Sequence, residues 1–279
     1  MALEVTPSRA TRAENEKQPK ARGAAKPRGY GSGRRLAFVL GLTPLVVGLV
    51  VWQIAGSPMS FTFPNPGTWW RAALSMHEQG LLIPALMRTI LTFVYGLALS
   101  VLVGVGAGWF IGANRLAERA LSPVLDFFRA MPSPALVPVA TVIFGVTVGM
   151  SAVVMLISIV WPVLLSTISA RKTIPPVRLE MGRVLGLSRF DQMRKIVFPS
   201  LLPAIMTGTR VAVSQGFVIA LLIDIIGAGA GIGRLLVVRQ QTFDGASVWA
   251  LLVVIGLFGL LANGLVALLD HRVQRGWKN

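Results

Sequence analysis

Long uncharged, apolar runs alternate with short polar segments along this chain of 279 residues. A helix rises about 1.5 Å per residue, so it needs about 20 apolar residues to cross a hydrocarbon core about 30 Å thick. The pattern predicts about six membrane-spanning helices, at 36–56, 89–112, 122–146, 150–170, 201–226 and 246–269. An all-α integral membrane fold follows, because only helices and closed barrels satisfy every backbone polar group in lipid.

The third and fourth spans come from one run, residues 130–170, which carries no charge. As a single helix this run would be about 60 Å long, so it must fold back, and the turn is expected near residues 144–149. At the start of the run, Pro132, Pro134 and Pro138 remove backbone donors. A kinked or broken helix is therefore expected there.

Basic residues are unevenly distributed between the polar segments. Segments 1–35, 113–121 and 171–200 and the C-terminal end carry 21 of the 27 Lys and Arg residues, whereas the segments on the other side carry four. The positive-inside rule therefore places both the N- and the C-terminus in the cytoplasm. The outer segments after residues 56 and 226 are expected to be loops, and the first of them carries aromatic residues suited to the headgroup level.

The first 35 residues are rich in Pro, Gly, Ala and basic side chains and poor in apolar ones. Such a segment cannot bury enough apolar surface to fold, so residues 1–35 are predicted to be a disordered basic cytoplasmic tail. The tail would set the topology, and contact with anionic lipid headgroups is the alternative. Residues 36–279 would form the transmembrane domain.

Composition supports a membrane protein and narrows its chemistry. Hydrophobic residues make up 54% of the chain and charged residues 14%, against about 25% charged in a soluble domain. The inner segments account for most of the net charge of +16, so no nucleic acid is expected as a partner. The chain has no cysteine, and His77 and His271 lack metal-ligand spacing, so no metal site is expected. No G-x4-G-K-[ST] motif for a nucleotide occurs.

The segment 171–200 is charged and helix-prone although apolar spans lie on both sides. A helical wheel places four apolar residues on one face, namely Leu187, Phe190, Met193 and Val197. Gly186 separates two helix-prone runs and accepts a positive φ at low cost. Two short helices joined at Gly186 and ending at Pro199 are therefore expected. Such a loop either lies in the lipid interface or docks on a partner.

Four residues in this segment have a specific spacing: Glu180, Gly186, Ile196 and Pro199. The spacing resembles the E-A-A-x3-G-x9-I-x-L-P loop of ABC importer permeases, with Met181 and Gly182 in place of the alanines and Phe198 in place of the leucine. The stretches LSPVLDFFRAMPSPALVPVATVIFGVTVG and GAGAGIGRLLVVRQQ resemble the nitrate, sulfonate, taurine and bicarbonate permeases. The resemblance extends from about residue 84 to the C-terminus, with Asp224 where an Ala-Glu pair is usual.

The resemblance implies the fold of a type I ABC importer permease in the cell inner membrane. The chain would form the path for a small solute, expected to be an anion of the nitrate, sulfonate, taurine or bicarbonate class. A permease of the same fold for another solute, such as a pyrimidine vitamin precursor, is the alternative. The implied partners are two copies of a cytoplasmic ABC ATPase, a second permease copy forming a homodimer, an extracytoplasmic solute-binding protein and membrane lipid. The chain itself would be no enzyme and hold no cofactor, with ATP and Mg²⁺ bound by the ATPase.

Two sets of site residues follow. The resemblance assigns ATPase coupling to residues of the loop 171–200, namely Glu180, Gly186, Leu187, Phe190, Ile196 and Pro199. Charges near or within the spans are candidates for the translocation path, namely Asp126, Arg129, Arg210 and Asp224. Asp126 and Arg129 are three residues apart and can form an ion pair on an interfacial helix. Asp224 can instead lie at the outer end of its span, so the sign of the solute stays open.

Two other classes of membrane protein are weaker alternatives. An ion-coupled secondary carrier would carry internal inverted repeats, which the chain does not display. An integral-membrane enzyme would need convergent acid, base or metal-binding residues, and the later spans offer only Asp126 and Asp224 as carboxylates. Neither alternative explains the spacing from Glu180 to Pro199.

Overall fold

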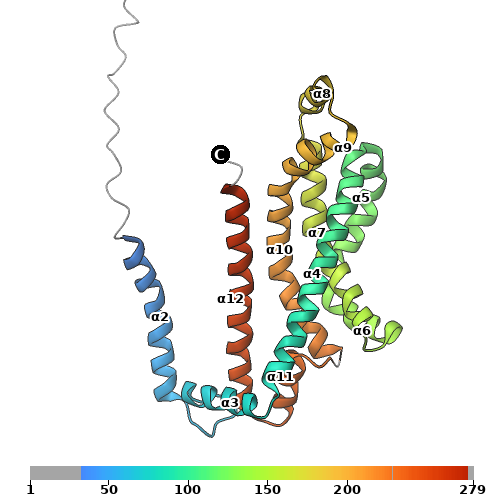
Figure 1. Cartoon of the computed structure of the whole chain (residues 1–279). Helices are drawn as coiled ribbons and strands as arrows, with labels where there is room; N and C mark the ends of the chain where they lie inside the picture. Colours follow the sequence, from blue (N-terminus) through green and yellow to red (C-terminus); the bar gives the residue numbers. More distant parts are fainter. Residues whose placement is uncertain (1–32, 228, 276–279) are drawn as a thin grey trace, which may run out of the picture. The chain divides into compact units, whose positions relative to one another are not determined.

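The computed structural model describes residues 33–227 and 229–275, and this part of the chain is helical, without a strand (Figure 1). In chain order the helices are α2 (Gly33–Ala55), α3 (Pro66–Glu78), α4 (Leu82–Ala113), α5 (Arg115–Ala130), α6 (Ser133–Phe144), α7 (Val148–Thr173), α8 (Pro176–Val184), α9 (Arg189–Gln192), the π-helical turn η1 (Met193–Val197), α10 (Phe198–Ile226), α11 (Ile232–Gln241) and α12 (Gly245–Arg275). Two compact units, Met1–Val51 and Trp52–Asn279, divide the chain. The predicted tail lies outside the described residues, except for its last three positions in α2.

Four of the described helices are long and apolar enough to cross a membrane: α4, α7, the continuous helix Arg189–Ile226 and the part Gly245–Leu268 of α12. The pair α5–α6, bent by 89°, provides a fifth span. The apolar part of α2 that the structure describes, Thr43–Ala55, is shorter. Two helices, α5 and α6, occupy the third span predicted at 122–146, with the break at the prolines where a kink or break was expected. The break follows from the proline-rich sequence, because the backbone leaves the helical region at Met131 and Pro132.

Helices α4 and α7 lie side by side and run in the same direction. A Cβ atom added to each of four glycines of α4 would meet successive residues of α7 within 3.0 Å, in the pairs Gly96 with Met155, Gly104 with Val163, Gly108 with Thr167 and Gly112 with Arg171. Glycine at these positions lets the two backbones approach closely, as in many membrane helix pairs.

The parallel arrangement of α4 and α7 decides what the bent pair α5–α6 does. The chain leaves α4 at one end of the bundle and enters α7 at the opposite end (Figure 1). The α5–α6 pair must therefore return the chain across the full depth of the bundle. It is a broken span and not a re-entrant loop.

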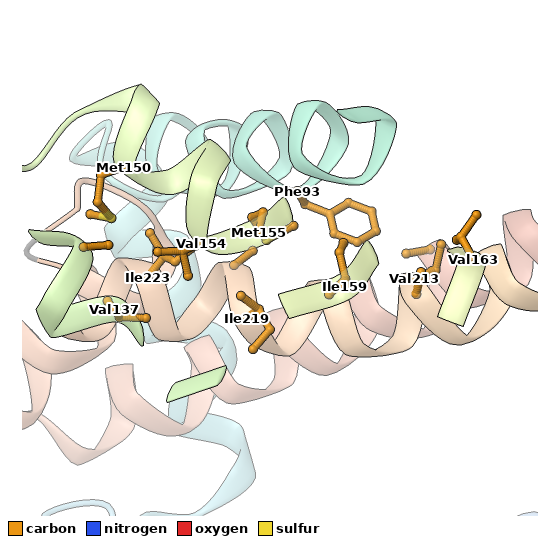
Figure 2. Packing of buried hydrophobic residues seen from close by; sticks show 14 residues of the cluster. Phe93, Val137, Met150, Val154, Met155, Ile159, Val163, Val213, Ile219 and Ile223 are labelled. Atoms are coloured by element: carbon orange, nitrogen blue, oxygen red, sulfur yellow. The ribbon is translucent and has the colours of Figure 1, made fainter. Parts of the chain in front are cut away.

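The hydrophobic core joins α4, α6, α7, α10 and α12 (Figure 2). Its fully buried members include Val137, Met155, Ile159 and Val213. Helix α10 runs antiparallel to α7, because a Cβ atom at Gly208 would meet the Pro162 carbonyl while one at Gly227 would meet Met150. The core therefore holds four spans and the second half of the broken one around a common seam.

The two outer segments predicted as loops contain helices α3 and α11. Helix α3 forms because Trp69 and Met76 are buried against Leu251 of α12 and Ile232 of α11. Trp69 is thus inside the protein, whereas its neighbour Trp70 is 74% exposed and can reach headgroups.

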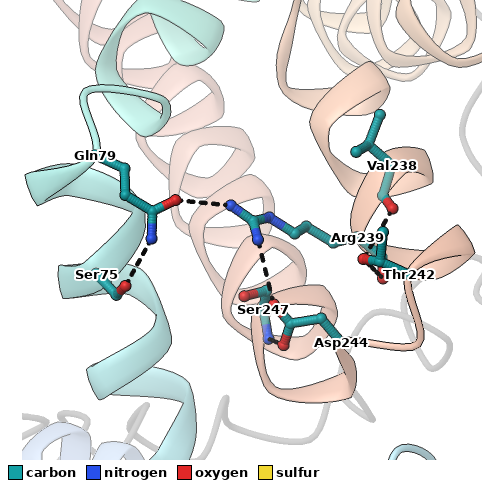
Figure 3. A network of polar contacts seen from close by, with 7 residues as sticks. All are labelled: Ser75, Gln79, Val238, Arg239, Thr242, Asp244 and Ser247. Carbon is teal, nitrogen blue, oxygen red and sulfur yellow. Dashed lines mark hydrogen bonds and ion pairs between the residues drawn. The ribbon is translucent and has the colours of Figure 1, made fainter.

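Arg239 connects the three helices α3, α11 and α12 at this end of the bundle (Figure 3). Its guanidinium donates a hydrogen bond to Gln79 Oε1 of α3 at 3.1 Å. It also forms a 3.5 Å ion pair with Asp244. Asp244 in turn accepts a hydrogen bond from the Ser247 backbone at the start of α12. The contact between Gln79 and Arg239 joins residues 160 positions apart in sequence, which local patterning does not reveal.

Candidate functional site

The segment between α7 and α10 folds as a helix, a tight turn and a second helix. Gly186 has a φ of 69°, and the amides of Gly186 and Leu187 donate to the carbonyls of Arg183 and Gly182 at 3.0 and 2.9 Å. This is a Schellman motif, which ends α8 with glycine in the left-handed region. Ser188 then accepts a hydrogen bond from the Asp191 amide and begins α9. The predicted corner at Gly186 is present.

The second helix was predicted to end at Pro199, but it does not. It continues through η1 into α10, so that Arg189–Ile226 is one helix. Pro199 lies in the first turn of α10, where its ring would crowd a regular turn and its nitrogen cannot donate. The chain relieves this crowding with a wide π turn, in which the Phe198 amide donates to the Met193 carbonyl.

An exposed apolar surface covers α8, the turn and α9, and we call it the coupling surface. Its residues are Val177 (60% exposed), Met181 (60%), Val184 (88%), Leu185 (74%), Phe190 (68%) and Met193 (44%). Phe190 and Met193 come from the predicted wheel face, but Val197 is buried against Leu201 and Ile205 instead. The predicted apolar face began at Leu187, so it did not include the exposed apolar residues of α8.

The remaining predicted coupling residues frame this surface. Glu180 is exposed, whereas Leu187, Ile196 and Pro199 are half-buried. Ile196 packs on Gly182, where a Cβ atom would meet its Cδ1 atom at 2.8 Å. The small residue at position 182 thus lets α8 lie close to the helix that follows.

A cavity of about 800 Å³ lies between the α5–α6 break, α7 and α10. Its polar lining residues are Arg129, Ser133, Ser158, Trp161, Ser166, Thr207, Ser214 and Gln215. The Ser158 hydroxyl is buried and has no hydrogen-bond partner among the described residues, a costly state unless a ligand or water supplies one. No carboxylate belongs to the lining that the described residues provide.

Of the four candidate path residues, Arg129 alone lines this cavity. Asp126 forms an ion pair with Arg129 at 3.2 Å, with both side chains more than half exposed. Arg210 is exposed on α10 but does not line the cavity. The serine, threonine and glutamine side chains were missed by a search restricted to charges. Their sequence signal was the presence of hydroxyls within apolar spans.

Asp224 lies elsewhere, buried where α4, α10 and α11 meet and 4% exposed. Its Oδ2 atom accepts a hydrogen bond from the Thr89 hydroxyl at 2.6 Å, and that hydroxyl accepts one from the Ile232 amide at 2.9 Å. Gly231 is in contact with both side chains, so that an added Cβ atom would overlap the Asp224 carboxylate. The glycine-rich stretch after α10 therefore encloses the chain's own carboxylate.

Comparisons with known proteins agree with this arrangement. The family described as "Binding-protein-dependent transport system inner membrane component" matches residues 100–275. The bicarbonate transport system permease protein CmpB of Synechococcus elongatus is 27% identical over 91% of this chain and 96% of its own length. The nitrate import permease protein NrtB of Leptolyngbya laminosa is 28% identical over 75% of this chain and 70% of its own.

Among solved structures, a chain of the MetNI methionine ABC transporter in an inward-facing conformation has the same fold. The TM-score is 0.56 at 18% identity, over 70% of this chain and 97% of that one. The family match covers more than half of the chain, and the fold, the bent span and the exposed loop are consistent with it. The chain therefore belongs to the inner-membrane components of binding-protein-dependent transport systems, as an ABC importer permease of the nitrate, sulfonate and bicarbonate group.

Proposed function

We propose that this permease forms the translocation path for a small oxyanion, such as bicarbonate, nitrate or a sulfonate. The observation that carries the proposal is the cavity between α6, α7 and α10, which combines Arg129 with several hydroxyl groups and no carboxylate of the described residues. Arginine and hydroxyl donors are the groups that bind oxyanions in proteins. The nitrate and bicarbonate relatives support this substrate class.

Ser158 and Arg129 have different roles in this proposal. The unpaired Ser158 hydroxyl would donate to the anion in transit, and Arg129 would supply positive charge while its pair with Asp126 moderates affinity. A path must bind its solute weakly enough to release it, and an exposed, partly neutralised arginine suits that need. The cavity is open on one side, where a second copy of the chain would complete the path.

Coupling to ATP hydrolysis would occur through the coupling surface. A short helix with exposed apolar side chains is suited to a groove on another protein. Leu185 and Phe190 are side chains of this kind, because neither is buried within this chain. One ATPase copy would bind the coupling surface of each permease in the homodimer, on the cytoplasmic side. An extracytoplasmic binding protein would deliver the solute to the end formed by α3 and α11.

Uptake by proteoliposomes tests this function directly. The permease is reconstituted with its ATPase and binding protein, and labelled bicarbonate, nitrate and taurine are supplied with internal ATP. We expect uptake of one of these solutes, each of which carries an oxyanion group, only with all three components. We further expect Ser158→Ala to raise KM by about tenfold, the value of one hydrogen bond to a charged group, without lowering stability. ATP-driven uptake of an uncharged pyrimidine precursor instead would contradict the proposal.

Two exposed apolar residues provide the test of coupling. Leu185→Glu combined with Phe190→Glu places charge on the coupling surface without disturbing the core, and we expect loss of ATPase co-purification and at least about a tenfold fall in uptake. Leu116→Glu is the matched control, because Leu116 is 76% exposed outside this surface. Retention of ATPase by the double variant would overturn the assignment of the docking surface.

A further inference from the structure

A second pocket, of about 730 Å³, lies between the end of α7 and the α8–α9 turn. It shares no lining residue with the cavity of the proposed path. Three arginines line it, Arg171, Arg183 and Arg189, together with Trp109 and Gln192. The described residues contribute no carboxylate to its walls. The pocket is therefore strongly basic.

The three arginines lack counter-charges within the described ranges 33–227 and 229–275, where none of them forms an ion pair. The Nε atom of Arg171 is buried and has no hydrogen-bond partner there. Its guanidinium lies over the Trp109 ring, 5.6 Å from the centroid, and this cation–π contact holds it in place. Three arginines that line one pocket without a counter-charge among the described residues, one of them with an unsatisfied buried donor, are a favourable setting for an anion.

We propose that this pocket binds a phosphate group, presented either by the headgroup of an anionic phospholipid or by a soluble phosphate. Guanidinium groups match the geometry of phosphate oxygens and bind them through paired hydrogen bonds. Trp109 and Arg171 lie near the ends of two spans, the level at which phospholipid headgroups lie. That this end faces the inner leaflet rests on the proposed function, whereas phosphate binding itself does not.

The position of the pocket gives the bound phosphate a regulatory role. Arg171 belongs to α7, while Arg183 and Arg189 lie on either side of the turn at Gly186. A phosphate bound by all three would therefore connect the coupling surface to a core span. Occupancy of the pocket would hold the coupling surface in one position and so alter how effectively ATPase movements reach the spans.

Binding to the purified full-length chain tests the proposal. The probes are phosphatidylglycerol in mixed detergent micelles, with phosphatidylcholine as the neutral lipid, and inorganic phosphate in lipid-free detergent. Native mass spectrometry counts bound lipid, and intrinsic tryptophan fluorescence during heating reports the shift in Tm. We expect Arg183→Gln with Arg189→Gln to weaken binding by at least about tenfold, because two charge-assisted contacts are lost.

The matched control is Arg178→Gln with Arg194→Gln. It removes the same charge from the same segment, at exposed residues that do not line the pocket. Unchanged binding in the control with loss in the pocket variant supports the proposal. A response to phosphatidylglycerol alone identifies a headgroup, and a response to inorganic phosphate as well identifies a soluble phosphate.

Two outcomes would overturn it. Equal weakening in both pairs would show a general effect of surface charge. Absence of any binding to the unaltered chain, with loss of ATPase binding in the pocket variant, would show that these arginines pair with carboxylates of the ATPase. Neither outcome depends on uptake, so failure of this proposal is distinguishable from failure of the transport function.

Discussion

At the scale of single residues, one hydroxyl joins three helices. Thr89 of α4 donates to the Asp224 carboxylate of α10 and accepts from the Ile232 amide at the start of α11. Both partners are buried, so neither can form a hydrogen bond with bulk water instead. The carboxylate of Asp224, a candidate path residue by sequence, thus connects the ends of three helices through Thr89.

Thr89→Val should therefore destabilise the protein by about 1–3 kcal/mol, because a similar side-chain volume leaves a buried carboxylate and a buried amide without their partner. Thr89→Ser retains the hydroxyl and should cost much less. The measurement is the apparent Tm of the purified protein in detergent. Thr141→Val is the control, since the Thr141 hydroxyl only contacts the Val137 carbonyl of its own helix. Equal Tm values for Thr89→Val and Thr141→Val would contradict this connecting role.

Gly186 and Gly231 are needed for different physical reasons. At Gly186 the backbone conformation itself requires glycine, and spacing in the sequence was enough to predict the turn. At Gly231 the conformation is ordinary and the requirement is space beside Asp224 and Thr89. That requirement arises from a contact between residues more than 130 positions apart, so a single sequence contains no local sign of it.

At the scale of helices, one face of α4 lies close to α7 and needs glycine, whereas another face has space for a larger side chain. A Cβ atom at Gly108 would approach the Leu164 carbonyl oxygen and the Thr167 Cβ atom at 2.8 Å, whereas one at Gly106 would meet nothing within 4 Å. The two positions are on the same helix and differ only in the face they occupy.

Gly108→Ala should destabilise the α4–α7 pair by about 1–3 kcal/mol through overpacking. Gly106→Ala should be neutral or stabilise it by up to about 1 kcal/mol, because alanine favours the helix. Unfolding in denaturant, followed by tryptophan fluorescence or by proteolysis, compares the two variants. A loss of stability in Gly106→Ala as large as in Gly108→Ala would show that the parallel packing described here is incorrect.

Hydropathy and proline positions predicted where most spans lie and that the third is broken. They did not predict α3 and α11, whose polar sequences are held in helices by Trp69, Arg239 and their partners on other elements. The continuation of α9 into α10 was also missed. A proline usually indicates a boundary, but here a π turn accommodates Pro199. Tertiary contacts decided each of these cases.

At the scale of the whole molecule, the parallel pair α4–α7 determines which loops share a side of the membrane. Residues near Leu116 and Val184 should lie on one side, and residues near Met59 and Val146 on the other. With the distribution of basic residues, the first pair is assigned to the cytoplasm. The natural absence of cysteine makes this arrangement directly testable.

Single substitutions Met59→Cys, Val146→Cys, Leu116→Cys and Val184→Cys place thiols at exposed positions. In intact cells with a permeable outer envelope, an impermeant maleimide should label the first two. It should label the last two only after the inner membrane is opened. Labelling of Val146→Cys from the cytoplasmic side alone would mean that α5–α6 does not cross the membrane.

The uninterrupted helix Arg189–Ile226 has a mechanical consequence. Its 38 residues extend for about 57 Å, from Phe190 of the coupling surface to Asp224 beside α11. A continuous helix of this length resists bending and twisting, and its one wide turn, η1, is the place where torque would be absorbed. Force applied by an ATPase near Phe190 would therefore reach the opposite face of the membrane mainly as displacement of a stiff rod, and any twist would be taken up at η1.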